Sequence, residues 1–102
     1  MVPRVDWSKR ASYIRARHGV EPAWANEALA DDHAVWLTPD PASRSGHGVR
    51  IIGYSPTAHA VLTVILVEAG ADPSEPPRGD WWGSNAWRAS ESDCHLYGEE
   101  DQ

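Results

Sequence analysis

The feature that most constrains the fold of this chain is an uninterrupted apolar run at residues 61–67, with the sequence Val-Leu-Thr-Val-Ile-Leu-Val. A strand with one face in water alternates apolar and polar residues, so a run of this kind needs cover on both faces. It is also far shorter than the roughly 18 to 20 residues of a membrane-spanning helix. The run predicts a buried strand over residues 59–68, at the centre of a sheet.

Other elements of an α+β domain can be placed around this central strand. Strand patterns occur at residues 34–37, 49–54 and 83–89. Two helices are expected before them, one from near Asp6 to Gly19 and one from Pro22 to near Asp31. A C-terminal helix begins at a Ser90 cap, with Asp93 in a capping-box position. Short links between consecutive strands favour an antiparallel meander of about four strands.

The length of 102 residues corresponds to a single domain, residues 1–102, with one modest core. Residues 42–48 and 72–80 have the composition of loops, and the acidic tail, residues 98–102, is expected to fray. A single cysteine cannot form an internal disulfide, and the N-terminus lacks a signal-peptide pattern. We expect a cytoplasmic protein that does not enter membranes.

The first predicted helix has an apolar face and a basic face. The residues of the apolar face recur at helical spacing and include one histidine: Trp7, Ala11, Ile14 and His18. Lys9, Arg10 and Arg17 supply positive charge elsewhere on the segment, although the whole chain has a net charge of −6. A local basic face of this kind suits a nucleic-acid partner, and ordinary solvation of a surface helix accounts for it equally well.

Four segments, taken in order, resemble one known family. They are Trp7-Ser8-Lys9 with Arg17-His18-Gly19-Val20, Ala34 to Asp40, Arg50-Ile51-Ile52-Gly53-Tyr54-Ser55, and Asn85-Ala86-Trp87-Arg88-Ala89-Ser90 followed by Tyr97-Gly98-Glu99-Glu100. This order is similar to that of BrnT-type toxins of the RelE/ParE superfamily. The chain departs from the family at Trp87, where the family has an arginine, in a longer and proline-richer connection at residues 72–80, and in its acidic balance.

The resemblance implies a RelE-like fold and the toxin of a type II toxin–antitoxin system. Such toxins are endoribonucleases that cleave RNA without a metal and arrest growth. A cognate antitoxin protein would be the partner and RNA the substrate, with DNA reached only through the antitoxin. No cofactor is implied. Cys94-His95 also lacks the paired ligand spacing of a zinc site.

Arg88 and Arg50 are the leading catalytic candidates, because arginine pairs bidentately with phosphate oxygens. Alternation puts Arg50 and Tyr54 on one face of their strand and Arg88 with Ser84 on one face of the other. If those faces coincide across the sheet, the two arginines flank one shallow site. His59, His18 and Tyr97 are candidates for proton transfer, with the choice among them open, and Lys9, Arg10 and Arg17 are candidates for RNA binding.

Each candidate also has a structural interpretation. Arg88 suits an ion pair to Glu91 or Asp93, His18 a helix C-terminus, His59 a solvated hairpin end, and Tyr97 core docking. The alternative function is a non-catalytic protein-binding module, favoured by Trp87 and by the net negative charge. The cluster of Trp81, Trp82 and Trp87 is compatible with a protein interface and with base stacking.

Overall fold

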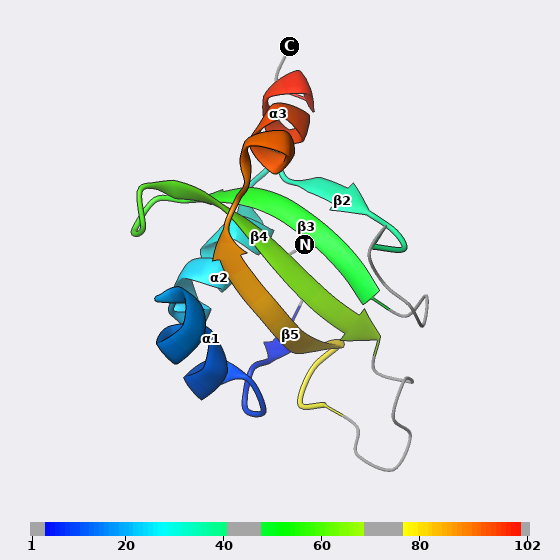
Figure 1. The fold of residues 1–102 in the computed structure, drawn as a ribbon. Coiled ribbons are helices and arrows are strands. Elements are labelled where there is room, and N and C mark those ends of the chain that lie inside the picture. Colours follow the sequence, from blue (N-terminus) through cyan, green and yellow to red (C-terminus); the bar gives the residue numbers. More distant parts are fainter. Residues whose placement is uncertain (1–3, 41–47, 69–76, 101–102) are drawn as a thin grey trace.

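The computed structural model describes residues 4–40, 48–68 and 77–100, and shows an α+β fold (Figure 1). The elements in chain order are β1 (Val5–Asp6), α1 (Ala11–His18), α2 (Pro22–Ala30), β2 (Val35–Leu37), β3 (Gly48–Ser55), β4 (Ala60–Glu68), β5 (Trp81–Arg88) and α3 (Glu91–Glu100). Most of the two predicted loops, residues 42–48 and 72–80, and the last two residues of the predicted frayed tail lie outside the described residues.

The described strands form one sheet in the order β1-β5-β4-β3-β2. The prediction that the apolar run occupies a central strand is confirmed, because β4 pairs with β3 on one side and β5 on the other. Strands β2 to β5 form the predicted antiparallel meander. The sheet is nevertheless five-stranded and mixed, since β1 pairs with β5 in parallel. The prediction of about four antiparallel strands is wrong in this respect.

Strand β1 replaces the predicted first turn of the first helix. The carbonyl of Arg4 accepts hydrogen bonds from the amides of Asp80 and Trp81, at 2.8 and 3.2 Å. The Asp6 carboxylate accepts from the amides of Ser8 and Arg78, both at 2.9 Å, instead of capping a helix. These bonds to distant residues hold the chain extended, so α1 begins only at Ala11.

The helices lie on both faces of the sheet. Helices α1 and α2 pack on one face of β3, β4 and β5. Helix α3 begins on the other face, contacts β2 and β3, and rises beyond the end of the sheet (Figure 1). The main core lies under α1 and α2 and includes Ile14, Val20, Ala28, Ile51, Leu62 and Val64, all fully buried. A Cβ atom on Gly53 would collide with the backbone of Ala28, so this glycine lets α2 approach β3 closely.

Helix α3 begins at the predicted cap, because the amide of Asp93 donates to Ser90 Oγ at 3.3 Å. The Asp93 carboxylate does not complete a capping box, because it accepts hydrogen bonds from Thr63 and Arg50 of the sheet. The helix continues to Glu100 and so includes residues 98–100 of the acidic tail. Their helical backbone continues the hydrogen-bond ladder begun at Ser90.

Candidate functional site

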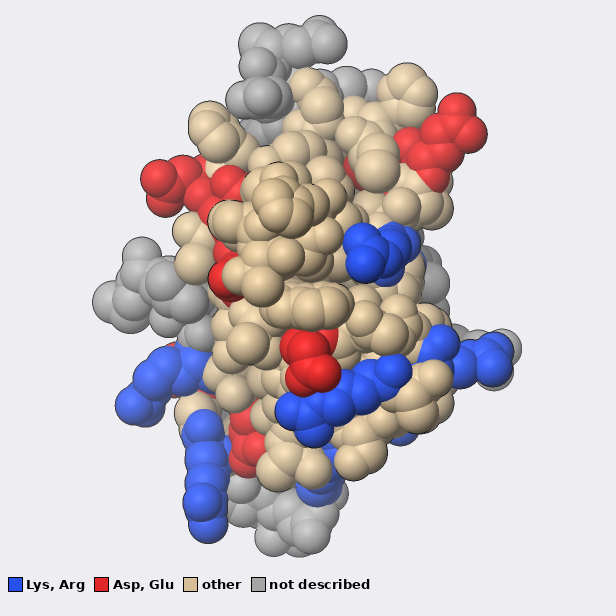
Figure 2. All heavy atoms as spheres, turned by 90° about the vertical axis from the view of Figure 1, so that its left-hand side faces the viewer, with Lys and Arg blue, Asp and Glu red and all other residues tan. Residues whose placement is uncertain are grey.

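An open pocket of about 690 Å³ lies between the C-terminal half of α1 and the end of β5. Its lining residues are Tyr13, Arg17, His18, Asn85, Trp87 and Arg88. On the side of the molecule that holds α1 and the β3–β4 hairpin, most Lys and Arg side chains lie in the lower half, and Asp and Glu project mainly from the upper half (Figure 2). A basic region therefore exists on this acidic chain, as its N-terminal composition indicates.

Helix α1 brings its part of the pocket together through helical spacing. Arg10, Tyr13 and Arg17 are three and four residues apart and so follow one side of the helix. The Arg10 guanidinium lies 3.9 Å from the centroid of the Tyr13 ring. Gly19 ends the helix in the left-handed conformation, with φ of 64°, which leaves His18 at the end of α1 beside β5.

The strand side of the pocket is an edge. Strand β1 pairs only with Trp81 and Trp82, so in the described part of the chain the outer edge of β5 beyond Trp82 faces α1 instead of another strand. Arg10 Nε donates to the carbonyl of Ser84 at 2.8 Å, and Lys9 Nζ lies 4.3 Å from the Trp82 ring centroid. The three predicted RNA-binding residues thus lie along one seam between α1 and β5, with Arg17 in the pocket itself.

Arg17 and Arg88 carry the positive charge of the pocket. Both side chains are exposed, and neither forms an ion pair or a hydrogen bond within the described residues. The structural interpretation of Arg88, an ion pair with Glu91 or Asp93, is not observed among the described residues. The Asp93 carboxylate is bonded to Arg50 and Thr63 instead. Two unpaired guanidinium groups at one pocket make it suitable for a phosphate.

His18 is the titratable residue that lies between the two sides of the pocket. Its imidazole contacts the rings of Tyr13 and Trp87, each with a centroid distance of 5.9 Å. His18 Nε2 is enclosed and has no hydrogen-bond partner among the described residues. An unpaired enclosed nitrogen of this kind costs about 1–3 kcal/mol.

Arg50 does not lie in this pocket. Its register partner is Ile65 on the face covered by α3, whereas Arg88 pairs with Leu62, which points into the core under α1 and α2. Arg50 and Arg88 therefore lie on opposite faces of the sheet, and the expectation that they flank one site is wrong. The predicted alternation within each strand is correct, but the register between the strands places the two series on opposite sides.

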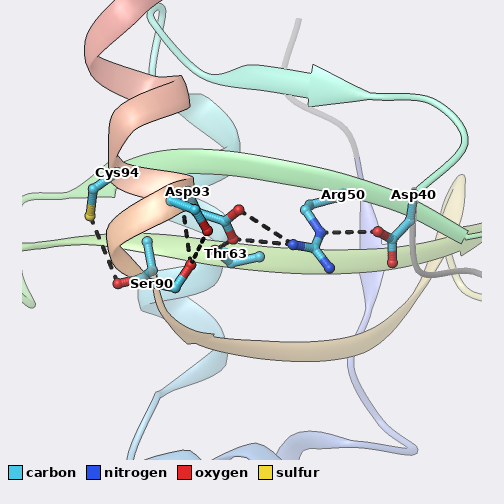
Figure 3. Close-up of polar contacts among 8 residues, drawn as sticks. Asp40, Arg50, Thr63, Ser90, Asp93 and Cys94 are labelled. Carbon is cyan, nitrogen blue, oxygen red and sulfur yellow. Dashed lines mark hydrogen bonds and ion pairs between the residues drawn. The ribbon is translucent and has the colours of Figure 1, made fainter.

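Arg50 is instead the centre of an ion-pair cluster beneath α3 (Figure 3). Its Nε donates to Asp40 Oδ1 at 3.0 Å, and its Nη1 lies 3.3 Å from Asp93 Oδ2. The Thr63 hydroxyl donates to the same Asp93 oxygen at 2.7 Å. The side chains of Arg50, Asp40 and Asp93 are only 19%, 7% and 6% exposed. This cluster of Asp40, Arg50, Thr63 and Asp93, the α3 anchor, ties the C-terminal helix to the sheet.

Tyr97 and His59 are also separate from the pocket. The Tyr97 hydroxyl donates to Asp31 Oδ2 at 2.6 Å, which joins α3 to the end of α2. Burial raises the pKa of Asp31, but hydrogen bonds from the Tyr97 hydroxyl and from the amides of His33 and Tyr54 outweigh it and lower the pKa below 3.8. His59 is exposed in the β3–β4 turn, where its φ is 53°. Of the three proton-transfer candidates, only His18 lies with Arg17 and Arg88.

Sequence reasoning did not identify Tyr13 and Asn85 as site residues. It treated Trp87 as a departure from the family and as part of a tryptophan cluster compatible with a protein interface or with base stacking. Helical spacing offered a signal for Tyr13, which lies between Arg10 and Arg17 on the same side of α1. Asn85 and Trp87 are two residues apart on β5. This part of β5 is an edge because β1 pairs only with Trp81 and Trp82, and the sequence did not reveal that pairing.

Comparison with protein-family models gives no match, and neither does a search of curated proteins. Among the described residues, no group of three or more His, Cys, Asp and Glu side chains is arranged to hold a metal ion. None of the helices in the described part of the chain is long and apolar enough to cross a membrane.

Proposed function

We propose that this protein is a metal-independent endoribonuclease whose active site is the pocket between α1 and β5. It acts as the toxin of a type II toxin–antitoxin pair, and the cognate antitoxin masks the basic seam between α1 and β5. The ordered resemblance to BrnT-type toxins supports this role, as does the α+β fold, with two helices before an antiparallel meander and one after it.

The observation that carries the proposal is the convergence of His18, Arg17 and Arg88 on one pocket. The three residues come from segments about 70 positions apart in the sequence, and none of their side chains has a hydrogen bond or ion pair within the described residues. Binding a phosphodiester would supply a partner for each. Residues with a purely structural role are usually paired, as Arg50 is in the α3 anchor.

RNA cleavage at this pocket uses the adjacent 2′-hydroxyl of the substrate as nucleophile. His18 accepts the hydroxyl proton while the 2′-oxygen bonds to phosphorus and the bond from phosphorus to the 5′-oxygen breaks. The departing 5′-oxygen takes up the proton that His18 accepted, relayed by water in the open pocket. The products are a 2′,3′-cyclic phosphate and a 5′-hydroxyl end, and no atom is supplied by a cofactor.

Arg17 and Arg88 stabilise the charge that develops on the phosphorane oxygens. Positive groups fixed in advance at the site of developing charge are usually the largest single contribution to catalysis. The two residues come from α1 and β5, so together they can hold a phosphate against His18 at the end of α1. Tyr97 and Arg50 stabilise the position of α3 and take no part in this reaction.

Growth and RNA integrity after induced expression test this function. Wild-type chain should arrest growth and fragment RNA, whereas Arg88→Ala should do neither while giving the same circular dichroism spectrum. Arg88 is exposed and unpaired within the described residues, so its truncation should cost little stability. A folded wild-type chain that neither arrests growth nor cuts RNA would contradict the proposal and favour the non-catalytic binding module.

A further inference from the structure

Trp87 lines the pocket but has no part in the cleavage chemistry described above. It lies on the edge strand β5, one residue before Arg88, and its indole is half-buried. The centroid of its ring lies 5.9 Å from the centroid of the His18 ring. The same centroid lies 5.9 Å from the guanidinium carbon of Arg50. Trp87 is thus fixed between the α3 anchor and the pocket, with part of its indole facing the pocket.

A tryptophan fixed beside two arginines has the composition of a site for an unpaired nucleobase. Aromatic side chains bind single-stranded nucleic acids by stacking on the bases, while cationic side chains bind the phosphates. The amide of Asn85, two residues earlier on the same strand, also lines the pocket and can both donate to and accept from a base edge. Paired bases of a duplex are already stacked, so such a site selects an unpaired one.

We propose that Trp87 is the platform on which one unpaired base of the RNA stacks, next to the phosphate held by Arg17 and Arg88. This inference rests on the proposed ribonuclease function and makes Trp87 a specificity-determining residue of that site. Trp87 is then part of the substrate-binding surface.

Binding of short single-stranded oligonucleotides tests the platform. The probe is a fluorescent 2′-O-methyl RNA of about eight nucleotides, which cannot be cleaved by its own 2′-hydroxyl and lies within the site sizes of single-strand binders. A set of such probes carries one abasic position each. The proteins are the wild-type chain, Trp87→Ala, Trp87→Phe, and the control Trp36→Ala, which removes a 41% exposed tryptophan on β2, outside the pocket.

For the wild-type chain, one abasic position should weaken binding by roughly 5- to 150-fold, the range found for one base stacked on an aromatic side chain. Trp87→Ala should bind the intact probe as weakly as the wild type binds the probe with that abasic position. The variant should bind the intact and the abasic probe with equal affinity. Trp87→Phe should keep part of the abasic effect, because it keeps a ring, and Trp36→Ala should match the wild type.

Two results would overturn the inference without affecting the proposed function. One is a wild-type chain that cleaves RNA while Trp87→Ala changes neither affinity, so that the abasic effect stays the same. The other is an equal loss of affinity for intact and abasic probes in Trp87→Ala, since a structural role would weaken both alike. A wild-type chain that binds none of the probes and cuts no RNA would overturn the inference and the ribonuclease proposal together.

Discussion

At the scale of single residues, side-chain pairing distinguishes Arg50 from Arg17 and Arg88. Arg50 is held by Asp40 and Asp93, whereas Arg17 and Arg88 are exposed and unpaired within the described residues. A guanidinium already bonded to two carboxylates has little positive charge to offer a phosphate. The lack of side-chain partners within the described residues therefore identifies Arg17 and Arg88 as site candidates more clearly than their sequence positions do.

Truncating Arg17 should reduce RNA cleavage by roughly 100-fold or more, which corresponds to the loss of one preorganised group that stabilises the transition state. The matched control is Arg15→Ala on the same helix. Arg15 forms an ion pair with Glu21 at 2.7 Å and is not a lining residue of the pocket. The initial rate of cleavage of a labelled RNA measures both variants, and equal rates for the two would contradict the assignment of Arg17.

The sequence indicated which residues could belong to a site, but it did not indicate which of them lie together in the fold. His18, Arg17 and Arg88 were candidates from the motifs alone, and the structure brings them to one pocket. The prediction that Arg50 and Arg88 flank one site was wrong, because alternation determines only which side chains of one strand share a face. The relation between two strands depends on register, and a shift of one residue exchanges every side chain between faces.

At the scale of elements, polar side-chain bonds join α3 to the rest of the fold. Leu96 is 37% exposed, and the helix is joined to the sheet by Asp93 and to α2 by Tyr97. The Ser90 cap was predictable because capping is local in sequence. The bonds of Asp93 to Thr63 and Arg50 were not, because they join residues 30 and 43 positions apart.

Removing the charge of Asp93 should loosen α3. In Asp93→Asn, Arg50 loses one of its two carboxylate partners, so we expect the free energy of unfolding to fall by about 1–3 kcal/mol. Urea denaturation measures the change. The control Asp32→Asn alters an exposed carboxylate without a partner in the described residues, and should stay within about 0.5 kcal/mol of the wild type. Equal stability of the two variants would show that the α3 anchor contributes little.

The bond between Tyr97 and Asp31 should make stability depend on pH. The lowered pKa of Asp31 stabilises the folded state above the unfolded value of about 3.8, and this contribution is lost as pH falls through the folded pKa. We expect Tyr97→Phe to cost about 1 kcal/mol at neutral pH, and the difference from the wild type to shrink at low pH. Thermal unfolding measured from pH 7 to pH 3 follows this difference.

The control for Tyr97 is Tyr54→Phe, which removes a hydroxyl that makes no hydrogen bond among the described residues. This variant should have nearly wild-type stability at every pH. A loss in Tyr97→Phe that stays constant from pH 7 to pH 3 would show that the hydroxyl acts through packing and not through the Asp31 carboxylate.

At the scale of the whole molecule, the apolar run at residues 61–67 was enough to predict the centre of the sheet, since only a strand covered on both faces accommodates it. It could not predict β1, because two residues have no measurable period and β1 is held by bonds to residues more than 70 positions away. That missed strand also shapes the candidate site. Its short pairing leaves the rest of β5 as the edge against which α1 forms the pocket.

The chain thus combines an acidic whole with a local basic seam between α1 and β5, the pattern expected if a small part of the surface binds RNA while the rest keeps the protein soluble. The most direct test is cleavage of a short single-stranded RNA by the purified chain in excess EDTA, with one substrate carrying a single 2′-deoxy nucleotide at the cleaved position. We predict cleavage of the all-RNA substrate to a 2′,3′-cyclic phosphate, and no cleavage at the deoxy position. Cleavage that EDTA abolishes, or that continues at the deoxy position, would contradict the proposed mechanism.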